Sequence, residues 1–150
     1  METISQVGDQ GGFCAAPHPM ARGMGMKSLS AFSIRQALRN QDTARILIGI
    51  ETYNATTLDR EGNQAARILA ERSNMAQTGS SDAHVLEAIG LGATIFPGSS
   101  ITEFVAALWT GTTQVRKEPE WGATQVLGKW AAHYLLSAPA HINAALVQRA

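Results

Sequence analysis

The segment Ile46-Leu47-Ile48-Gly49-Ile50 is an unbroken apolar run in a chain of 150 residues. Its short length and its β-branched side chains favour a strand over a helix. A strand that lacks polar positions is buried on both faces, which is typical of the parallel sheets of α/β proteins. The run therefore predicts a central parallel strand with helices packed on both sides.

Strand and helix patterns alternate on either side of this run. Apolar segments at residues 13–16, 75–78 and 90–96 predict further strands, and residues 112–115 form a shorter candidate. Apolar residues at helical spacing predict helices over 28–40 and 59–73. The first is expected to bury Leu29, Phe32, Ala37 and Leu38, and the second Leu58, Ala65, Ile68 and Leu69. This order predicts an α/β fold whose parallel strands are joined by right-handed crossovers.

Two amphipathic helices are predicted in the last third of the chain. The first has one apolar face made by Ile101, Phe104, Val105, Leu108 and Trp109. Ser100 and Glu103 fit a capping box at its start, and Gly111 fits its end. The second contains Leu127, Trp130, Ala131, Tyr134 and Leu135, and is expected to end at Pro139. We expect residues 1–115 to form one α/β unit and residues 116–150 a helical extension packed on it.

The composition excludes several classes of protein. Hydrophobic residues make up 45% and charged residues 16% of the chain, which is typical of a globular domain. Lys+Arg and Asp+Glu number 12 each, so no net charge attracts nucleic acid or an anionic membrane. The single cysteine, Cys14, rules out a disulfide framework and indicates a reducing compartment. With neither a signal peptide nor a membrane-spanning run, a cytoplasmic protein is expected.

Candidate metal ligands follow three consecutive predicted strands. The loop Thr78-Gly79-Ser80-Ser81-Asp82-Ala83-His84 carries a carboxylate and an imidazole two residues apart, and both are ligands for divalent cations. His18 and Glu51 come after the two preceding strands. The carboxyl ends of parallel strands form one edge, so the pattern predicts a metal site there. The alternatives are an Asx turn with a surface histidine, a structural His18 between prolines, and a Glu51 that only pairs with a cation or caps a backbone amide.

Three motifs resemble the later motifs of the PHP (polymerase and histidinol phosphatase) superfamily. They are residues 11–19 (GGFCAAPHP), residues 48–55 (IGIETYNA) and residues 79–84 (GSSDAH). The resemblance spans about residues 1–115 and is strongest to the stand-alone metal-dependent phosphoesterases. It implies a distorted seven-stranded β/α barrel with up to three divalent ions (Mn, Zn or Fe). It also implies that His18, Asp82 and His84 are metal ligands, with Glu51 and Asn54 beside the ligands or on the substrate side.

The resemblance covers only the C-terminal half of that barrel. Members of the superfamily open with a His-x-His motif and an Asp-His motif, and neither occurs before His18. We therefore expect a partial PHP-type domain with an incomplete metal site, acting on a phosphoester such as a nucleotide or a sugar or amino-alcohol phosphate. The alternative is a non-catalytic remnant that binds metal or a partner. An open sheet leaves unpaired edges, so a homo-oligomer or a complementary N-terminal half is expected as partner.

Overall fold

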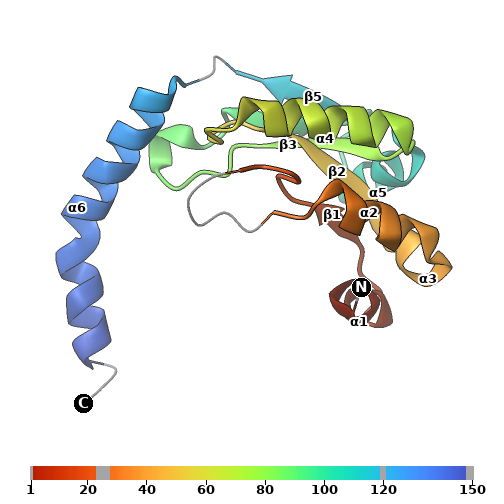
Figure 1. Cartoon of the computed structure of the whole chain (residues 1–150), viewed down its shortest axis with the longest axis horizontal. Helices are drawn as coiled ribbons and strands as arrows, with labels where there is room; N and C mark the ends of the chain where they lie inside the picture. Colours follow the sequence, from red (N-terminus) through yellow and green to blue (C-terminus); the bar gives the residue numbers. More distant parts are fainter. Residues whose placement is uncertain (1, 23–27, 119–120, 148–150) are drawn as a thin grey trace.

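The computed structural model describes residues 2–22, 28–118 and 121–147, with side chains described as far as residue 136 (Figure 1). Its elements are α1 (Glu2–Asp9), β1 (Cys14–Ala16), α2 (Ala31–Arg39), α3 (Gln41–Ala44), β2 (Leu47–Asn54), α4 (Arg60–Arg72), β3 (Ala76–Ser80), a 3₁₀ turn η1 (Leu86–Ala88), β4 (Gly92–Ile95), α5 (Ile101–Thr110), β5 (Gln114–Lys117) and α6 (Ala123–Val147). The predicted α/β class is confirmed.

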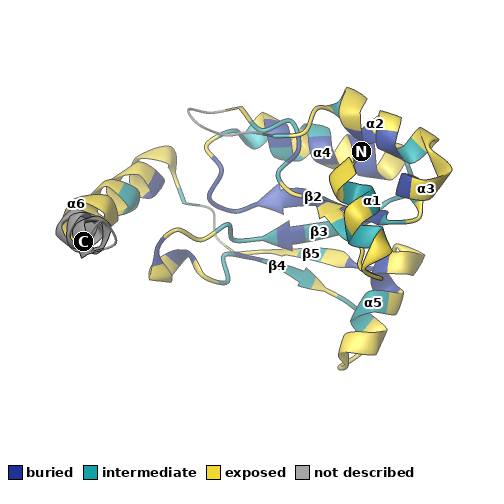
Figure 2. Cartoon of the chain, turned by 90° about the horizontal axis from the view of Figure 1, so that it is seen from below, coloured by how far each residue is buried: buried dark blue, intermediate teal, exposed yellow. Residues whose placement is uncertain are grey.

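A three-stranded parallel sheet, in the order β1-β2-β3, is the centre of the fold. The central strand β2 is buried along its whole length, as the apolar run predicts (Figure 2). On one face of the sheet, Leu47 and Ile50 pack against helices α2 and α4. On the other face, Ile48 packs with Ala76 and with Leu108 of α5. Two apolar layers therefore hold the sheet and fix where its carboxyl ends lie.

Helix α4 buries a face that only partly matches the predicted one. Its ends agree with the sequence, since Asp59 caps the first turn and Ser73 closes the last. The buried positions are Gly62, Ala66, Leu69 and Ala70. Of the residues predicted in the core, Leu69 is buried and Ala65 is partly buried, whereas Leu58 and Ile68 are exposed. Small side chains allow a helix backbone to approach a sheet closely, but they contribute little to a hydrophobicity pattern. The prediction is therefore confirmed at Leu69 and wrong at the larger residues Leu58 and Ile68.

Helix α2 shows the same kind of error. Ser30 caps it, and Ile34 and Ala37 are its buried residues. Leu29 and Phe32, which we expected in the core, are exposed, and Phe32 is 71% accessible. Ala37 was placed correctly, and Leu38 is partly buried against the same core.

The last two strands depart from the predicted parallel arrangement. β4 and β5 pair antiparallel with each other, and Ile95 faces Gln114. Because these residues are the end of β4 and the start of β5, the connection through α5 returns to the same end of the strand and does not cross over. The pair lies alongside β3 (Figure 2). At the contact, a Cβ on Gly92 would lie 2.3 Å from the carbonyl oxygen of Ser80, so only glycine permits this approach.

The helix α5 matches its predicted ends. Ser100 and Glu103 form both halves of a capping box, and Gly111 closes the helix with φ of 66°. Its predicted apolar face is only partly used, because Leu108 is buried while Ile101 and Trp109 are exposed.

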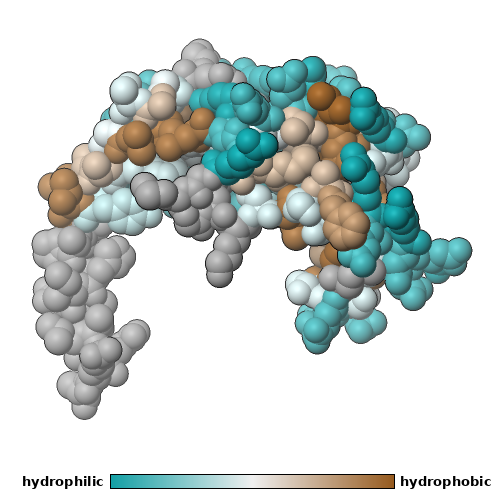
Figure 3. All heavy atoms as spheres, viewed as in Figure 1, coloured by the Kyte–Doolittle hydropathy of each residue, from teal (hydrophilic) through white to brown (hydrophobic). Residues whose placement is uncertain are grey.

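The helix α6 is longer than predicted, because it continues through Pro139 to Val147. Figure 3 shows apolar surface along its described part, where Leu127, Leu135 and Leu136 are exposed. Val126 is its buried residue near the start. The predicted boundary at residue 115 falls inside β5. Among the described residues, no helix is long and apolar enough to cross a membrane.

Candidate functional site at the carboxyl ends of the parallel strands

Glu51 ties together the ends of β1 and β3. It lies within β2, not after it as the sequence suggested, and it is 8% exposed. One carboxylate oxygen accepts a hydrogen bond from the backbone N–H of His18, and the other accepts from the hydroxyl of Ser80. A buried carboxylate is stable only when its oxygens are bonded in this way. Glu51 therefore acts as a clamp that sets the positions of the chain after β1 and at the end of β3.

Asn54, the last residue of β2, orients the carboxylate of Asp82. Its side-chain Nδ2 donates to Asp82 Oδ2 at 2.9 Å, and its Oδ1 accepts from the backbone N–H of Thr57 at 2.9 Å. The side chain of Asn63 brackets the same residue, accepting from its backbone N–H and donating to its carbonyl, both at 3.0 Å. Asn54 is fully buried, and its bond to the N–H of Thr57 is buried with it, whereas the bond to the partly exposed Asp82 carboxylate is only partly shielded from water.

The loop that follows β3 holds Asp82 in a strained conformation. Asp82 has φ of 46°, in the left-handed region that side chains other than glycine seldom adopt. The hydroxyl of Thr56 lies 2.9 Å from each of two carbonyl oxygens, those of Ser81 and Asp82, and donates to them. A conformation of this kind costs about 1–3 kcal/mol and persists only where its surroundings impose it. Here Thr56 and Asn54 supply that constraint.

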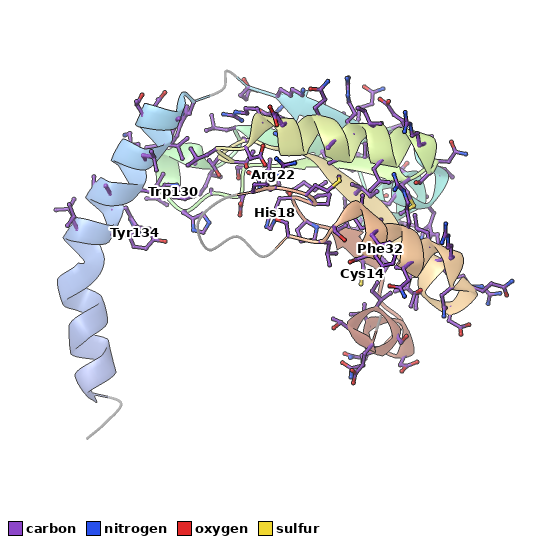
Figure 4. All side chains as sticks on the ribbon, in the orientation of Figure 1. Cys14, His18, Arg22, Phe32, Trp130 and Tyr134 are labelled. Atoms are coloured by element: carbon purple, nitrogen blue, oxygen red, sulfur yellow. The ribbon has the colours of Figure 1, made fainter. Side chains whose placement is uncertain are left out.

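His84 lies beside Asp82 and against the helix α6. His84 Nε2 is 3.8 Å from Asp82 Oδ1, and the imidazole is 46% exposed. The ring of Trp130 approaches it edge-on, with 4.9 Å between ring centroids. Figure 4 shows Trp130 and Tyr134 on the side of α6 that faces the strands. The imidazole is therefore oriented by α6 while one side stays open.

An ion pair fastens α6 to the turn after His84. Lys129 Nζ donates to Glu87 Oε1 at 2.8 Å. The hydrogen bond from Lys129 and its positive charge lower the pKa of the Glu87 carboxyl. Both side chains are about half exposed, so the pair adds orientation more than stability.

His18 lies at the end of β1 and does not join Asp82 and His84. Its φ is 27°, and its ring Nδ1 is 3.2 Å from the hydroxyl of Ser28. Figure 4 shows it on the segment that leaves β1, with Arg22 farther along the same segment. In the described part of the chain, no three His, Cys, Asp or Glu residues form a group that could hold a metal ion. The structure thus brings Asp82, His84 and Asn54 together and keeps His18 apart.

The donor atoms of Asp82 and His84 are close enough together to occupy two coordination positions of one divalent ion. A carboxylate and an imidazole bind zinc at about 2.0–2.2 Å. Their donor atoms are 3.8 Å apart, which is less than twice that distance, so one ion can reach both. Asp82 Oδ2 is already bonded to Asn54, and this leaves Oδ1 for the ion.

Two residues that shape this site were missed by the sequence. Thr56 binds the carbonyls of the Asp82 loop, and Trp130 contacts the ring of His84. They lie 26 and 46 positions from their partners, and no local pattern links them. The one available signal for Thr56 is its place in the polar run that follows β2.

The segment that carries Asp82 and His84 matches a known protein family. Residues 60–113 match a family model described as PHP-associated. Comparisons with curated proteins and with solved structures gave no match. The matched segment runs from α4 to the residue before β5 and includes Asp82 and His84, but not His18 or Glu51. The resemblance inferred from the motifs is confirmed in this segment, which is similar to the C-terminal region of the PHP superfamily.

Proposed function

We propose that this chain supplies Asp82 and His84 to a PHP-type site for metal-dependent hydrolysis of phosphoesters. The observation that carries the proposal is the oriented pair itself. A carboxylate and an imidazole lie 3.8 Å apart after a parallel strand, inside the segment that matches the PHP-associated family. The wider fold on this proposal is the C-terminal part of a distorted seven-stranded barrel. The parallel order β1-β2-β3 with flanking helices supports it.

Side chains of this chain would hold the ion and leave its other coordination positions open to the substrate. Asp82 Oδ1 and His84 Nε2 would hold it, Asn54 would keep the Asp82 carboxylate from rotating, and Trp130 would fix the imidazole plane. His18 would serve a further ion, with Glu51 setting its backbone position. A bound divalent ion (Mn, Zn or Fe) would acidify a water molecule and neutralise charge on the phosphate oxygens.

The remaining ligands would come from residues outside this sequence. The His-x-His and Asp-His motifs of the superfamily are not among these 150 residues. A complementary N-terminal half or a second copy of the chain is the proposed partner. Strand β1 supports this, because within the described residues it pairs with β2 on one side and has no strand on the other. An unpaired strand edge is a ready surface for another chain. The proposed substrate is a phosphoester such as a nucleotide or a sugar or amino-alcohol phosphate.

A second function is favoured by one observation. The described residues contain no group of three or more potential ligands, and a multinuclear cluster needs more donors than a pair. A chain of this kind would bind an ion or a partner without hydrolysing a phosphoester. The two functions differ in whether metal binding leads to turnover.

The test is a metal titration of the purified chain after EDTA dialysis, with Mn²⁺ and Zn²⁺ measured separately by calorimetry. We expect at most one weakly held ion per chain, lost in Asp82→Ala and in His84→Ala. The matched controls Asp9→Ala and His133→Ala should bind as the wild type does, since they remove the same donor types elsewhere. Hydrolysis of a chromogenic phosphoester by the isolated chain should be slow. Binding that survives both site substitutions would contradict the proposal.

A further inference from the structure

The helix α6 meets the candidate metal site through one face near its start. Val126, Lys129 and Trp130 are spaced at i, i+3 and i+4, so they lie on the same side of the helix. Val126 is buried. Lys129 Nζ pairs with Glu87 Oε1 at 2.8 Å. The ring of Trp130 lies edge-on against that of His84. These three residues of α6 are the contact face of the helix.

The rest of the described helix is free of this contact. Among the described side chains of α6, residues 123–136, all except Val126 and Trp130 are exposed. In the described part of the chain, neither apolar layer of the sheet contains a residue of α6. Figure 1 shows the helix running on beyond the contact face and away from the sheet. Over the described side chains, α6 is therefore attached along little more than one turn, and it can leave without opening the core.

Few interactions hold the contact face in place. The Lys129–Glu87 pair is about half exposed, and exposed ion pairs contribute little to stability. Val126 adds the burial of a single aliphatic side chain. Within the described residues, the indole N–H of Trp130 is buried and has no hydrogen-bond partner, which destabilises the arrangement that buries it. A modest free-energy change at the site is thus enough to shift α6 between a seated and a released state.

Seating of α6 limits the orientations of His84. A histidine side chain that nothing restrains has about six orientations, three at χ1 and two at χ2. With Trp130 against the ring, one orientation is retained, in which Nε2 lies 3.8 Å from Asp82 Oδ1. An ion that needs both donors binds better to a chain in which they are already placed. The advantage of the seated state reaches about sixfold if a single orientation is kept.

We propose that α6 is a latch on the candidate metal site. The inference rests on the proposed role of Asp82 and His84 as metal ligands. With α6 seated, His84 is oriented for the ion, and with α6 released, the ring turns freely and the ion is held more weakly. Coupling between two equilibria is reciprocal, so a bound ion favours the seated helix by the same factor. A partner that binds the released helix lowers the affinity of the site for its ion.

The test reverses a charge on the contact face and leaves both ligands untouched. Lys129→Glu sets a second carboxylate against Glu87 and should release α6. The double variant Glu87→Lys with Lys129→Glu restores the pair with its charges exchanged and should seat the helix again. Arg67→Glu is the matched control, because it makes the same change of charge in an exposed pair on α4, where Glu71 lies 3.9 Å away.

The first readout needs no metal. In EDTA, the nuclear Overhauser effect between the ring protons of Trp130 and His84 reports whether α6 is seated, since the ring centroids lie 4.9 Å apart. We expect it in the wild type, in the double variant and in Arg67→Glu, and expect it to be largely lost in Lys129→Glu. Circular dichroism melting of each chain shows that the fold is retained. Absence of the effect in the wild type, or its full retention in Lys129→Glu, overturns the latch.

The second readout is the affinity for Zn²⁺, measured by calorimetry. Lys129→Glu should bind about three- to sixfold more weakly than the wild type, although negative charge added near a cation by itself favours binding. The double variant and Arg67→Glu should bind as the wild type does. Equal affinities of Lys129→Glu and the wild type overturn the latch and leave the metal proposal standing. A wild type that binds no Zn²⁺ refutes the metal proposal and with it the coupling, whatever the first readout shows.

Discussion

Substitution of Asn54 by alanine tests how the Asp82 loop is held. The change removes the donor to Asp82 Oδ2 and the acceptor for the N–H of Thr57, both at 2.9 Å. Asn54 is fully buried, so water cannot replace its hydrogen bond to Thr57. The two backbone bonds to Asn63 can persist, because they do not involve the substituted side chain.

The magnitude follows from those two bonds. An unsatisfied buried N–H costs about 1–3 kcal/mol. A hydrogen bond to the Asp82 carboxylate would contribute about 1.5–3 kcal/mol if fully buried, and less here because that carboxylate is partly exposed. The free energy of unfolding should therefore fall by about 2–4 kcal/mol. Asn54→Asp keeps the acceptor for Thr57 but sets a carboxylate against Asp82, so it should disturb the loop more selectively.

The assay is urea unfolding followed by circular dichroism. If the dependence of the unfolding free energy on urea concentration (the m-value) is the same in variant and wild type, a change in the unfolding midpoint measures a change in stability. Amide spectra of residues 81–84 report the loop. Asn40→Ala is the matched control: Asn40 caps α3 with two hydrogen bonds, so its loss should cost about 1 kcal/mol and leave the loop spectrum unchanged. If Asn54→Ala lies within about 0.5 kcal/mol of the wild type, the loop is held by something else.

Three further predictions follow from other parts of the fold. Ser100→Ala breaks the capping box of α5 and should lower the free energy of unfolding by about 1 kcal/mol in the same urea assay; no change would contradict the cap. Hydrogen bonds, first from the N–H of Ser99, lower the pKa of Glu103 below 4.5. The stabilisation that the ionised Glu103 provides is thus present above pH 4.5 and lost as the pH falls through the lowered pKa. The wild type should therefore be more stable than Glu103→Gln at neutral pH and equally stable in acid, and a stability difference that does not change with pH would contradict this. Ala15→Lys at the β1 edge should shift a homo-oligomer toward monomer in analytical ultracentrifugation, while Ala106→Lys on α5 should not; a 16 kDa monomer indifferent to both would exclude pairing at that edge.

The central strand and the helix ends were predictable because local chemistry decides them. An apolar run rich in β-branched residues favours a strand that is buried on both faces, and β2 is buried throughout. The capping box of α5 places its donors and acceptors within four residues, so its geometry is readable from spacing. The motif carrying Asp82 and His84 was likewise local.

The rest of the fold depends on contacts between distant segments. Ala66 packs in the core with Leu47 and Ile50, and Gly62 lies against the backbone of Ala21, but such small residues give no strong pattern in a sequence. β4 and β5 pair antiparallel because α5 brings the chain back to the end of β4 where it left the sheet. The spacing of apolar residues in the sequence does not show to which end a helix returns the chain. The roles of Thr56 and Trp130 arise only when their partners are folded beside them.

The most direct test of the central claim is the location of a bound paramagnetic ion. Mn²⁺ added in small steps to ¹⁵N-labelled chain should broaden the amide signals of residues 81–85 first, because Asp82 and His84 supply the two donors. Asp82→Asn should remove this selective broadening, while Asp9→Asn should not. Selective loss of the 81–85 signals that depends on Asp82 is the result that the account predicts. Broadening centred elsewhere, or unchanged in Asp82→Asn, would contradict it.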